Sequence, residues 1–219
     1  MQNHSLDIKT YYGRRAPEYD QIYLRPERQP ALRELERRVH TSLMGRRILE
    51  VACGTGYWTH LLSPTAREVI ATDINEEMLR IARDRCQSCP DVAFRLMDAY
   101  ALEEDLGSFD GAFLGFWWSH LLKQDIPRFL YSLHARLEDR ARVVIVDNRY
   151  VAGSSTPVCR EDVDGNTYQL RKLMDGSSYE VVKNFPDVGE IRAAVDDFAN
   201  TFSHENLDYY WLVQYEYRK

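Results

Sequence analysis

Short apolar runs alternate with amphipathic segments through the middle of the chain. The run 48–52 reads Ile-Leu-Glu-Val-Ala and leads into Gly54-Thr55-Gly56, the pattern of a buried strand that ends in a tight turn. Similar runs occupy 68–72, 92–96, 109–115 and 143–146. Because helical patterns separate these runs, they predict parallel strands joined by crossover helices.

Apolar residues spaced three and four positions apart mark the helices. The segment 26–44 is predicted to be helical and is followed, after the first strand, by a short helix over 57–62. Asn75 is expected to cap a helix that runs to about Arg85. The expected inward positions are Leu32, Leu35, Val39 and Leu43, then Met78, Ile81 and Ala82, and finally Ile126, Phe129, Leu130, Leu133 and Leu137 of a fourth helix.

The pattern changes after residue 147. A polar stretch at 150–166 reads as a loop, and Asp175-Gly176 between two strand-like runs is a hairpin signal. A helix is predicted over 188–195, and runs at 198–203 and 209–217 predict an antiparallel pair at the sheet edge. We therefore expect an α/β fold, a doubly wound, seven-stranded and mostly parallel sheet. The chain is predicted to be a single domain over 1–219, with a cap segment at 1–24 and a lid insertion at 150–185.

The composition is that of a folded protein, and the charge narrows its partners. The net charge of −6 opposes attraction to nucleic acid phosphates. Arginines between 33 and 47 are better read as the solvent face of a helix than as a basic patch. The N-terminal ten residues have no apolar core, and the aliphatic run 143–146 is too short to span a bilayer. We expect a cytoplasmic monomer or homodimer without nucleic acid or membrane partners.

The cysteine pattern does not predict a metal site. Cys86 and Cys89 have the C-x-x-C spacing, but no second pair follows, and a structural zinc site needs four ligands. A redox dithiol normally lies where a strand meets the N-terminus of a helix. The pair lies instead at the end of a predicted helix, before Pro90, so neither function is expected.

In an open α/β sheet the ligand lies beyond the carboxyl ends of the strands, where the strand order reverses. This rule selects 53–56, Asp73, Asp98, 116–120 and 147–149 before any family is considered. Asp73 can accept hydrogen bonds from ribose hydroxyls, and Asp98 from an adenine amine, although each is also well placed to cap a helix or a loop.

The residues around the glycine turn discriminate between cofactors. A dinucleotide site would have a small residue at position 59, completing G-x-G-x-x-G, whereas this chain has Thr59. Glu50 brings a negative charge close to where pyrophosphate would lie, and that charge suits an ammonium group. A ligand with a cationic amine, a sulfonium and a ribose therefore fits better than NAD.

The stretch 49–56, Leu-Glu-Val-Ala-Cys-Gly-Thr-Gly, resembles the first motif of the class I S-adenosylmethionine (SAM)-dependent methyltransferases, E/D-x-G-x-G-x-G. Asp73, Met97-Asp98-Ala99 and the run 109–112 fall where later motifs of that family belong. The resemblance covers about residues 45–148. It departs from the motif at Ala52 or Cys53 and at Trp58, which predicts a tight pocket near the methionine end.

The resemblance implies that SAM is the cofactor and that this is a methyltransferase (EC 2.1.1) acting on a small molecule. Glu50 and the glycine backbone would hold the methionine portion, Asp73 the ribose, and Asp98 and Ala99 the adenine. Arg14 or Arg15 would pair with the SAM carboxylate, unless the N-terminal segment is simply a surface helix. The implied cofactor-binding set is Tyr11, Arg14, Glu50, Ala52, Gly54, Gly56, Trp58, Asp73, Ile74, Asp98, Ala99, Tyr100 and Phe116.

The acceptor is expected to be a small molecule methylated on nitrogen or oxygen. The fourth strand is followed by Phe-Trp-Trp-Ser-His rather than by the N/D-P-P-Y/F of nucleic-acid amine methylases, and no Pro-Cys pair is present. His120 is the candidate general base, with a core histidine as the plain alternative. The expected substrate-binding residues are Tyr19, Trp117, Trp118, Arg149, Arg171 and Tyr210. The competing hypotheses are a non-catalytic SAM-binding protein and an NAD-dependent oxidoreductase.

Overall fold

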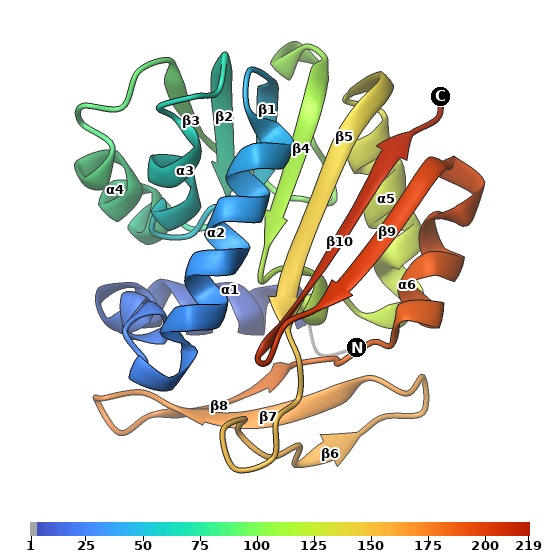
Figure 1. The fold of residues 1–219 in the computed structure, drawn as a ribbon. Helices are drawn as coiled ribbons and strands as arrows, with labels where there is room; N and C mark the ends of the chain where they lie inside the picture. Colours follow the sequence, from blue (N-terminus) through green and yellow to red (C-terminus); the bar gives the residue numbers. More distant parts are fainter. Residues whose placement is uncertain (1–3) are drawn as a thin grey trace.

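The computed structural model describes residues 4–219, in which a large sheet stands over a small one (Figure 1). The large sheet has seven strands in the order β3-β2-β1-β4-β5-β10-β9. Its parallel strands are β1 (Arg47–Val51), β2 (Glu68–Asp73), β3 (Val92–Leu96), β4 (Phe109–Gly115) and β5 (Leu137–Asn148). Because the strand order reverses between β1 and β4, a crevice opens beyond their carboxyl ends.

Two antiparallel strands complete the large sheet. β10 (Tyr210–Tyr217) pairs with β5, and β9 (Ala199–Asn206) pairs with β10. The expectation of a doubly wound, mostly parallel seven-stranded sheet with an antiparallel edge pair is therefore confirmed.

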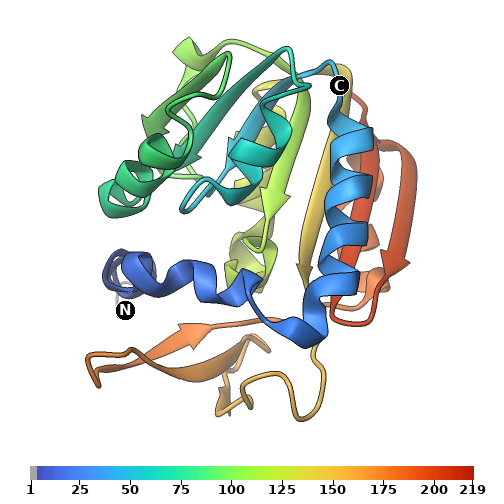
Figure 2. The same ribbon diagram turned by 60° about the vertical axis from the view of Figure 1, so that its left-hand side comes forward.

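Helices cover both faces of the large sheet (Figures 1 and 2). On one face, α2 (Gln29–Leu43), α3 (Tyr57–Leu62) and α4 (Glu76–Arg85) bury leucine and valine side chains against the sheet. On the other face, α5 (Ile126–His134) and α6 (Val188–Val195) pack on a second apolar cluster. The predicted bounds of α3 and α6 agree with the structure.

The N-terminal helix and the small sheet lie under the carboxyl ends of the parallel strands (Figure 2). Helix α1 (His4–Arg15) continues into a 3₁₀ segment, η1 (Ala16–Tyr23), before α2 begins. The small antiparallel sheet consists of β6 (Arg160–Glu161), β7 (Thr167–Lys172) and β8 (Ser178–Val182). Ile8 and Tyr11 of α1 form an apolar cluster with Leu173 and Val181, so the helix is held between the two sheets.

The helix predicted to include Leu137 is shorter than its spacing suggested. Helix α5 ends at His134, and Leu137 begins β5, where it pairs with Phe109. The register then shifts opposite Gly111, and Arg140 adopts a left-handed φ of 67°. This irregular start hid the first half of β5, since the sequence showed only its apolar second half.

Helix α4 begins in a different way from the one expected. Asn75 is the N-cap residue, but its side chain makes no capping hydrogen bond; the Asp73 carboxylate accepts from the Asn75 N–H instead, at 2.9 Å. Ile81 is only half-buried, and Leu79 takes its place beside Met78 on the buried face. Within residues 4–219, no helix combines the length and the apolar character needed to cross a membrane.

Candidate active site

A left-handed turn connects β1 to α3. Ala52, Gly54 and Gly56 have φ of 55°, 57° and 75°, a region that favours glycine. A Cβ on Gly56 would also lie 2.9 Å from the Cβ of Ala82 in α4. The turn therefore keeps the N-terminus of α3 close to α4, with backbone rather than side chains facing the crevice.

Asp73 at the end of β2 connects this turn to the start of α4. Its carboxylate accepts from the backbone N–H of Gly54 and from that of Asn75, each at 2.9 Å. Burial raises the pKa of Asp73 to about 6, although these hydrogen bonds lower it. One carboxylate thus orders both turns at the carboxyl end of the sheet.

A cavity of about 360 Å³ opens at these strand ends, within the roughly 300–1,000 Å³ range of small-molecule sites. Of the predicted cofactor-binding residues, the structure brings eight to its wall: Ala52, Gly54, Asp73, Ile74, Asp98, Ala99, Tyr100 and Phe116. Ile8, Lys9 and Tyr12 of α1 also line it, so α1 closes one side of what we call the first cavity.

Two polar groups in or near the first cavity are buried in unusual states: one is a donor without a hydrogen-bond partner among the described residues, and the other is a carboxyl group with a raised pKa. The indole N–H of Trp117, a wall residue, is buried without a hydrogen-bond partner among the described residues. Glu50 is only 1% exposed and lies outside the wall, where Thr59 Oγ1 donates to its Oε2 at 2.7 Å. Burial raises the pKa of Glu50 to about 8, so at pH 7 the side chain is mostly protonated in the empty protein.

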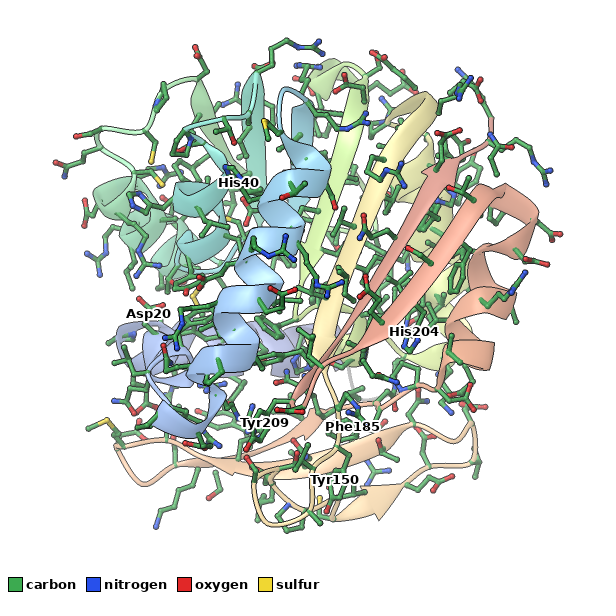
Figure 3. The ribbon with its side chains drawn as sticks, in the orientation of Figure 1. Asp20, His40, Tyr150, Phe185, His204 and Tyr209 are labelled. Atoms are coloured by element: carbon green, nitrogen blue, oxygen red, sulfur yellow. The ribbon has the colours of Figure 1, made fainter. Side chains whose placement is uncertain are left out.

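A second cavity of about 90 Å³ adjoins the first. Tyr12, Tyr19, Phe116 and His120 line both cavities. The floor of the second cavity includes Phe185, whose ring makes an edge contact with that of Tyr150 at 5.3 Å between centroids (Figure 3). A ligand in one cavity can therefore lie next to a ligand in the other, beside the side chains that the two cavities share.

The wall of the second cavity is strongly cationic. It contains Arg15, Arg25, Arg28, Arg171 and Lys183, and no aspartate or glutamate among residues 8–219, whose side chains the structure describes, lines it. Within the same residues none of these four arginines forms a salt bridge, whereas Lys183 pairs with Asp147 at 3.0 Å. The cavity thus concentrates positive charge that the protein itself does not neutralise.

The arginines are held by neutral partners. Arg28 donates from Nη2 to Ser154 Oγ at 2.8 Å and from Nη1 to Asn148 Oδ1 at 3.3 Å, while its Nε–H is buried and has no partner in the part of the chain that the structure describes. Arg171 donates to the side-chain oxygen of Gln169, and burial lowers the pKa of Arg171. These contacts orient the guanidinium groups and leave their charge unpaired.

Lys183, in the wall of the second cavity, is held by buried hydrogen-bond partners. Asp147 is fully buried and accepts from Lys183 Nζ and, at 2.8 Å, from the backbone N–H of Ser119. Burial lowers the pKa of Lys183, while the Asp147 carboxylate raises it. This pair fixes the segment after β4 to β8.

His120 is buried, and both of its ring nitrogens have partners. Its Nδ1 lies 2.7 Å from the carbonyl oxygen of Val182, so Nδ1 carries the proton. Its Nε2 therefore accepts from the Tyr12 hydroxyl, also at 2.7 Å. Burial, followed by the charge of Lys183, lowers the pKa of His120 well below its usual value, which keeps the imidazole neutral.

Six predicted site residues lie outside both cavity walls, in addition to Glu50. Trp58 packs on Phe113 in the core, and Trp118 belongs to the apolar cluster under α5. Arg149 is exposed and donates to the carbonyl of Leu207 at 2.8 Å. The remaining three are Tyr11 against Tyr179, Arg14 bonded to the Tyr179 hydroxyl, and Gly56 against Ala82. The two adjacent tryptophans differ because Trp118 begins a short 3₁₀ helix after β4 and is buried in the core, whereas Trp117, which precedes that helix, lines the cavity.

Five further residues that the sequence analysis selected line one or both cavities: Tyr19, Trp117, His120, Arg171 and Tyr210. Tyr12, Arg28 and Lys183 were not selected for the site. Lys183 follows β8 directly, and the two adjacent buried valines before it give no alternation from which an inward position could be inferred. Arg28 carried no signal either, because its role depends on segments about 120 residues away.

Comparison with known proteins gives consistent results. Residues 48–140 match a family model described as a methyltransferase domain. The chain is 37% identical over 73 residues to a ubiquinone biosynthesis O-methyltransferase from Methylococcus capsulatus, a match that covers 32% of this chain and 31% of that protein. It is 27% identical over 208 residues to a demethylmenaquinone methyltransferase from Tropheryma whipplei, covering 90% and 86% of the two chains.

Two solved structures share the whole architecture. The complex of DhpI with SAH has a TM-score of 0.82 and 23% identity, covering 100% of this chain and 98% of that one. The DhpI-SAM-HEP complex has a TM-score of 0.79 and 24% identity, covering 98% of each chain. The similarity includes α1 and the small sheet, since almost every residue is aligned.

Proposed function

The chain belongs to the class I SAM-dependent methyltransferases, and on this premise we propose that it transfers the methyl group of SAM to an oxygen of a small anionic acceptor. The observation that carries the proposal is the second cavity, in which four unpaired arginines adjoin the cofactor cavity. The acceptor class and the atom that is methylated are both part of the proposal.

SAM occupies the first cavity in this proposal. The Asp73 carboxylate accepts from the ribose hydroxyls, and Asp98 with Ala99 frames the adenine, on which Ile74 or Tyr100 packs. The unpaired indole N–H of Trp117 supplies a donor for a nitrogen or oxygen of the cofactor. Glu50 lies just outside the cavity wall; in this proposal it ionises on binding, and its charge attracts the SAM ammonium group, which offsets the cost of burying both charges.

The acceptor in the second cavity carries an oxyanion such as a carboxylate, phosphate or phosphonate. Guanidinium groups bind these anions through two parallel hydrogen bonds. The buried and unpartnered Nε–H of Arg28 costs free energy that an anion would recover. The second cavity, at about 90 Å³, is a quarter of the size of the first and suits a small head group.

The reaction is an in-line displacement at the methyl carbon. An acceptor oxygen forms the new C–O bond as the C–S bond breaks, and the electron pair of that bond neutralises the sulfonium. The oxyanion becomes a methyl ester, and no proton is transferred. The protein contributes alignment across the shared aromatic wall and the exclusion of water.

His120 acts as a positioning residue in this scheme rather than as the general base of the sequence hypothesis. An oxyanion is already deprotonated, and the Nε2 lone pair of His120 is engaged by the Tyr12 hydroxyl. The imidazole instead fixes the Tyr12 ring between the two cavities, with the Val182 carbonyl fixing the imidazole.

The quinone-methylating relatives suggest a second candidate, an aromatic quinol. The long match to demethylmenaquinone methyltransferase favours it. The cationic wall and the small volume of the second cavity favour the oxyanion, since a neutral ring would leave the arginines unpaired in a desolvated site. We therefore place the oxyanion first.

The test measures SAH formation with matched acceptor pairs: a carboxylate, a phosphate monoester and a phosphonate, each beside its neutral methyl ester, together with a naphthoquinol. Turnover with an anion and none with its ester supports the proposal. Turnover with the quinol alone contradicts it. Arg171→Gln should raise KM for the anion at least tenfold and leave the Kd of SAM unchanged, whereas Arg33→Gln, an exposed change on α2, should alter neither.

Thermal shift with SAM, SAH and NAD tests the competing hypotheses. Stabilisation by NAD alone would exclude the methyltransferase assignment. Tight SAM binding without turnover of any acceptor in the panel would favour a non-catalytic SAM-binding protein.

A further inference from the structure

A cluster of soft metal-ligating atoms lies on the outer side of the α3–α4 pair, away from both cavity walls. His60, Cys86 and Cys89 each offer one ligand atom, and these three atoms all lie within 4.8 Å of one another. In the part of the chain that the structure describes, this is the one group of three or more histidine, cysteine, aspartate or glutamate residues that could hold a metal ion. The contact between Cys89 Sγ and His60 Nδ1 is 3.5 Å.

From this geometry we propose that His60, Cys86 and Cys89 form a binding site for a thiophilic divalent cation of the Zn²⁺ class. Zn²⁺ takes cysteine and histidine ligands at about 2.0–2.3 Å, which places tetrahedral ligand atoms roughly 3.5 Å apart. The histidine–cysteine contact already meets this spacing. A separation of up to 4.8 Å must close by about 1.3 Å to reach this spacing, and the side chains of exposed His60 and half-buried Cys89 can rotate to do so.

The backbone presents the two cysteines in a suitable turn. Cys86 is the C-cap residue of α4, and its carbonyl accepts from the Cys89 N–H at 3.0 Å. This hydrogen bond folds the C-x-x-C segment so that both sulfur atoms lie on the same side, facing α3. Pro90 follows directly and stops the chain from continuing the helix.

The bound complex would be electrically neutral. Metal binding replaces both thiol protons, which pass to solvent, and gives a neutral complex of two thiolates, one imidazole and the dication. A water molecule completes four-coordination, because the three side chains leave one position open.

The site connects the helices that carry both turns of the cofactor cavity. Helix α3 begins at the glycine turn, and α4 begins just after Asp73. Close packing of Gly56 on Ala82 already brings the helices together near the cavity. A metal at His60, Cys86 and Cys89 would clamp them at a second point.

The test uses the full chain, purified without metal and kept reduced with a phosphine. Titration with Co²⁺ should give thiolate-to-metal absorption that saturates at one equivalent, and Zn²⁺ should displace it and raise Tm. Mg²⁺ should do neither. Cys89→Ser should abolish the absorption, and His60→Ala should weaken Co²⁺ binding by more than about tenfold. Cys159→Ser, a change of an exposed cysteine on the small-sheet side, should leave binding intact.

Three outcomes would overturn the proposal: no charge-transfer band in the reduced wild type, a band that survives in Cys89→Ser, or a band that disappears in Cys159→Ser. Because Cys89 and His60 are not buried, their variants should fold, and an unchanged SAM-induced thermal shift checks this. The readout is spectroscopic, so it is independent of the acceptor and of turnover.

Discussion

The variant Glu50→Gln should be more stable than the wild type near neutral pH while binding SAM more weakly. Glu50 is 1% exposed, and burial raises its pKa from 4.5 to about 8. Between these two values the folded protein holds a proton that the unfolded chain has released. Folding stability therefore falls as pH rises through this window, and the contribution is lost above about pH 8.

The magnitude follows from the pKa difference. pH 7 lies about 2.5 units above the pKa of 4.5 in the unfolded chain. At about 1.36 kcal/mol per pH unit, the wild type has lost about 3 kcal/mol of its free energy of unfolding at pH 7. Glutamine resembles the protonated acid in shape and carries no titrating proton, so Glu50→Gln escapes this loss. It also cannot ionise to pair with an ammonium group, which should weaken SAM binding by about 1.5–3 kcal/mol.

Urea unfolding from pH 4.5 to 8.5 without SAM, read by tryptophan fluorescence, measures the first effect. The free-energy curves of the two proteins should lie close together at pH 4.5 and diverge towards pH 8, with the variant higher. Calorimetric titration with SAM measures the second effect. A variant that is less stable than the wild type throughout, or that binds SAM equally well, would refute the reasoning.

Three further predictions concern polar residues in the walls of the two cavities. Lys183→Met should lower the free energy of unfolding by about 3–5 kcal/mol, because it leaves Asp147 as a buried and unpaired charge; urea titration measures this, and an unchanged midpoint would contradict the pairing. Asp73→Asn should weaken SAM binding by about 1–3 kcal/mol in calorimetry, and equal affinity would remove Asp73 from the ribose role. His120→Gln should lower kcat without shifting the pH profile between pH 6 and 8, because the depressed pKa of His120 keeps it neutral there; a wild-type profile that requires deprotonation in this range would restore the general-base hypothesis.

The local parts of the fold could be predicted from the sequence because their signals are local. The glycine turn at 54–56, the alternation of strands with helices and the Asp175-Gly176 hairpin all depend on neighbouring residues. The start of β5 could not be recognised from the sequence, because Arg140 interrupts the strand pattern and Leu137 continues the helical spacing of α5.

The first cavity was largely predictable, and the second was predictable only in part. Residues that end parallel strands must meet at one edge of the sheet, which is why Asp73, Asp98 and Phe116 came together. The cationic wall combines η1, the loop after β5, and the small sheet. No spacing rule connects Arg28 with Arg171, so only the folded chain reveals that their charges converge.

The proposed meeting of two charged reactants beside the side chains shared by the two cavities has a kinetic consequence. In the proposed reaction, a sulfonium and an oxyanion lie together beside Tyr12 and Tyr19 in surroundings of low dielectric, where opposite charges attract strongly. Each reactant should therefore tighten the binding of the other. Methyl transfer cancels one charge of each sign, so the thioether and the ester lose this mutual attraction. The same arrangement that promotes assembly of the ternary complex therefore favours its dissociation into products.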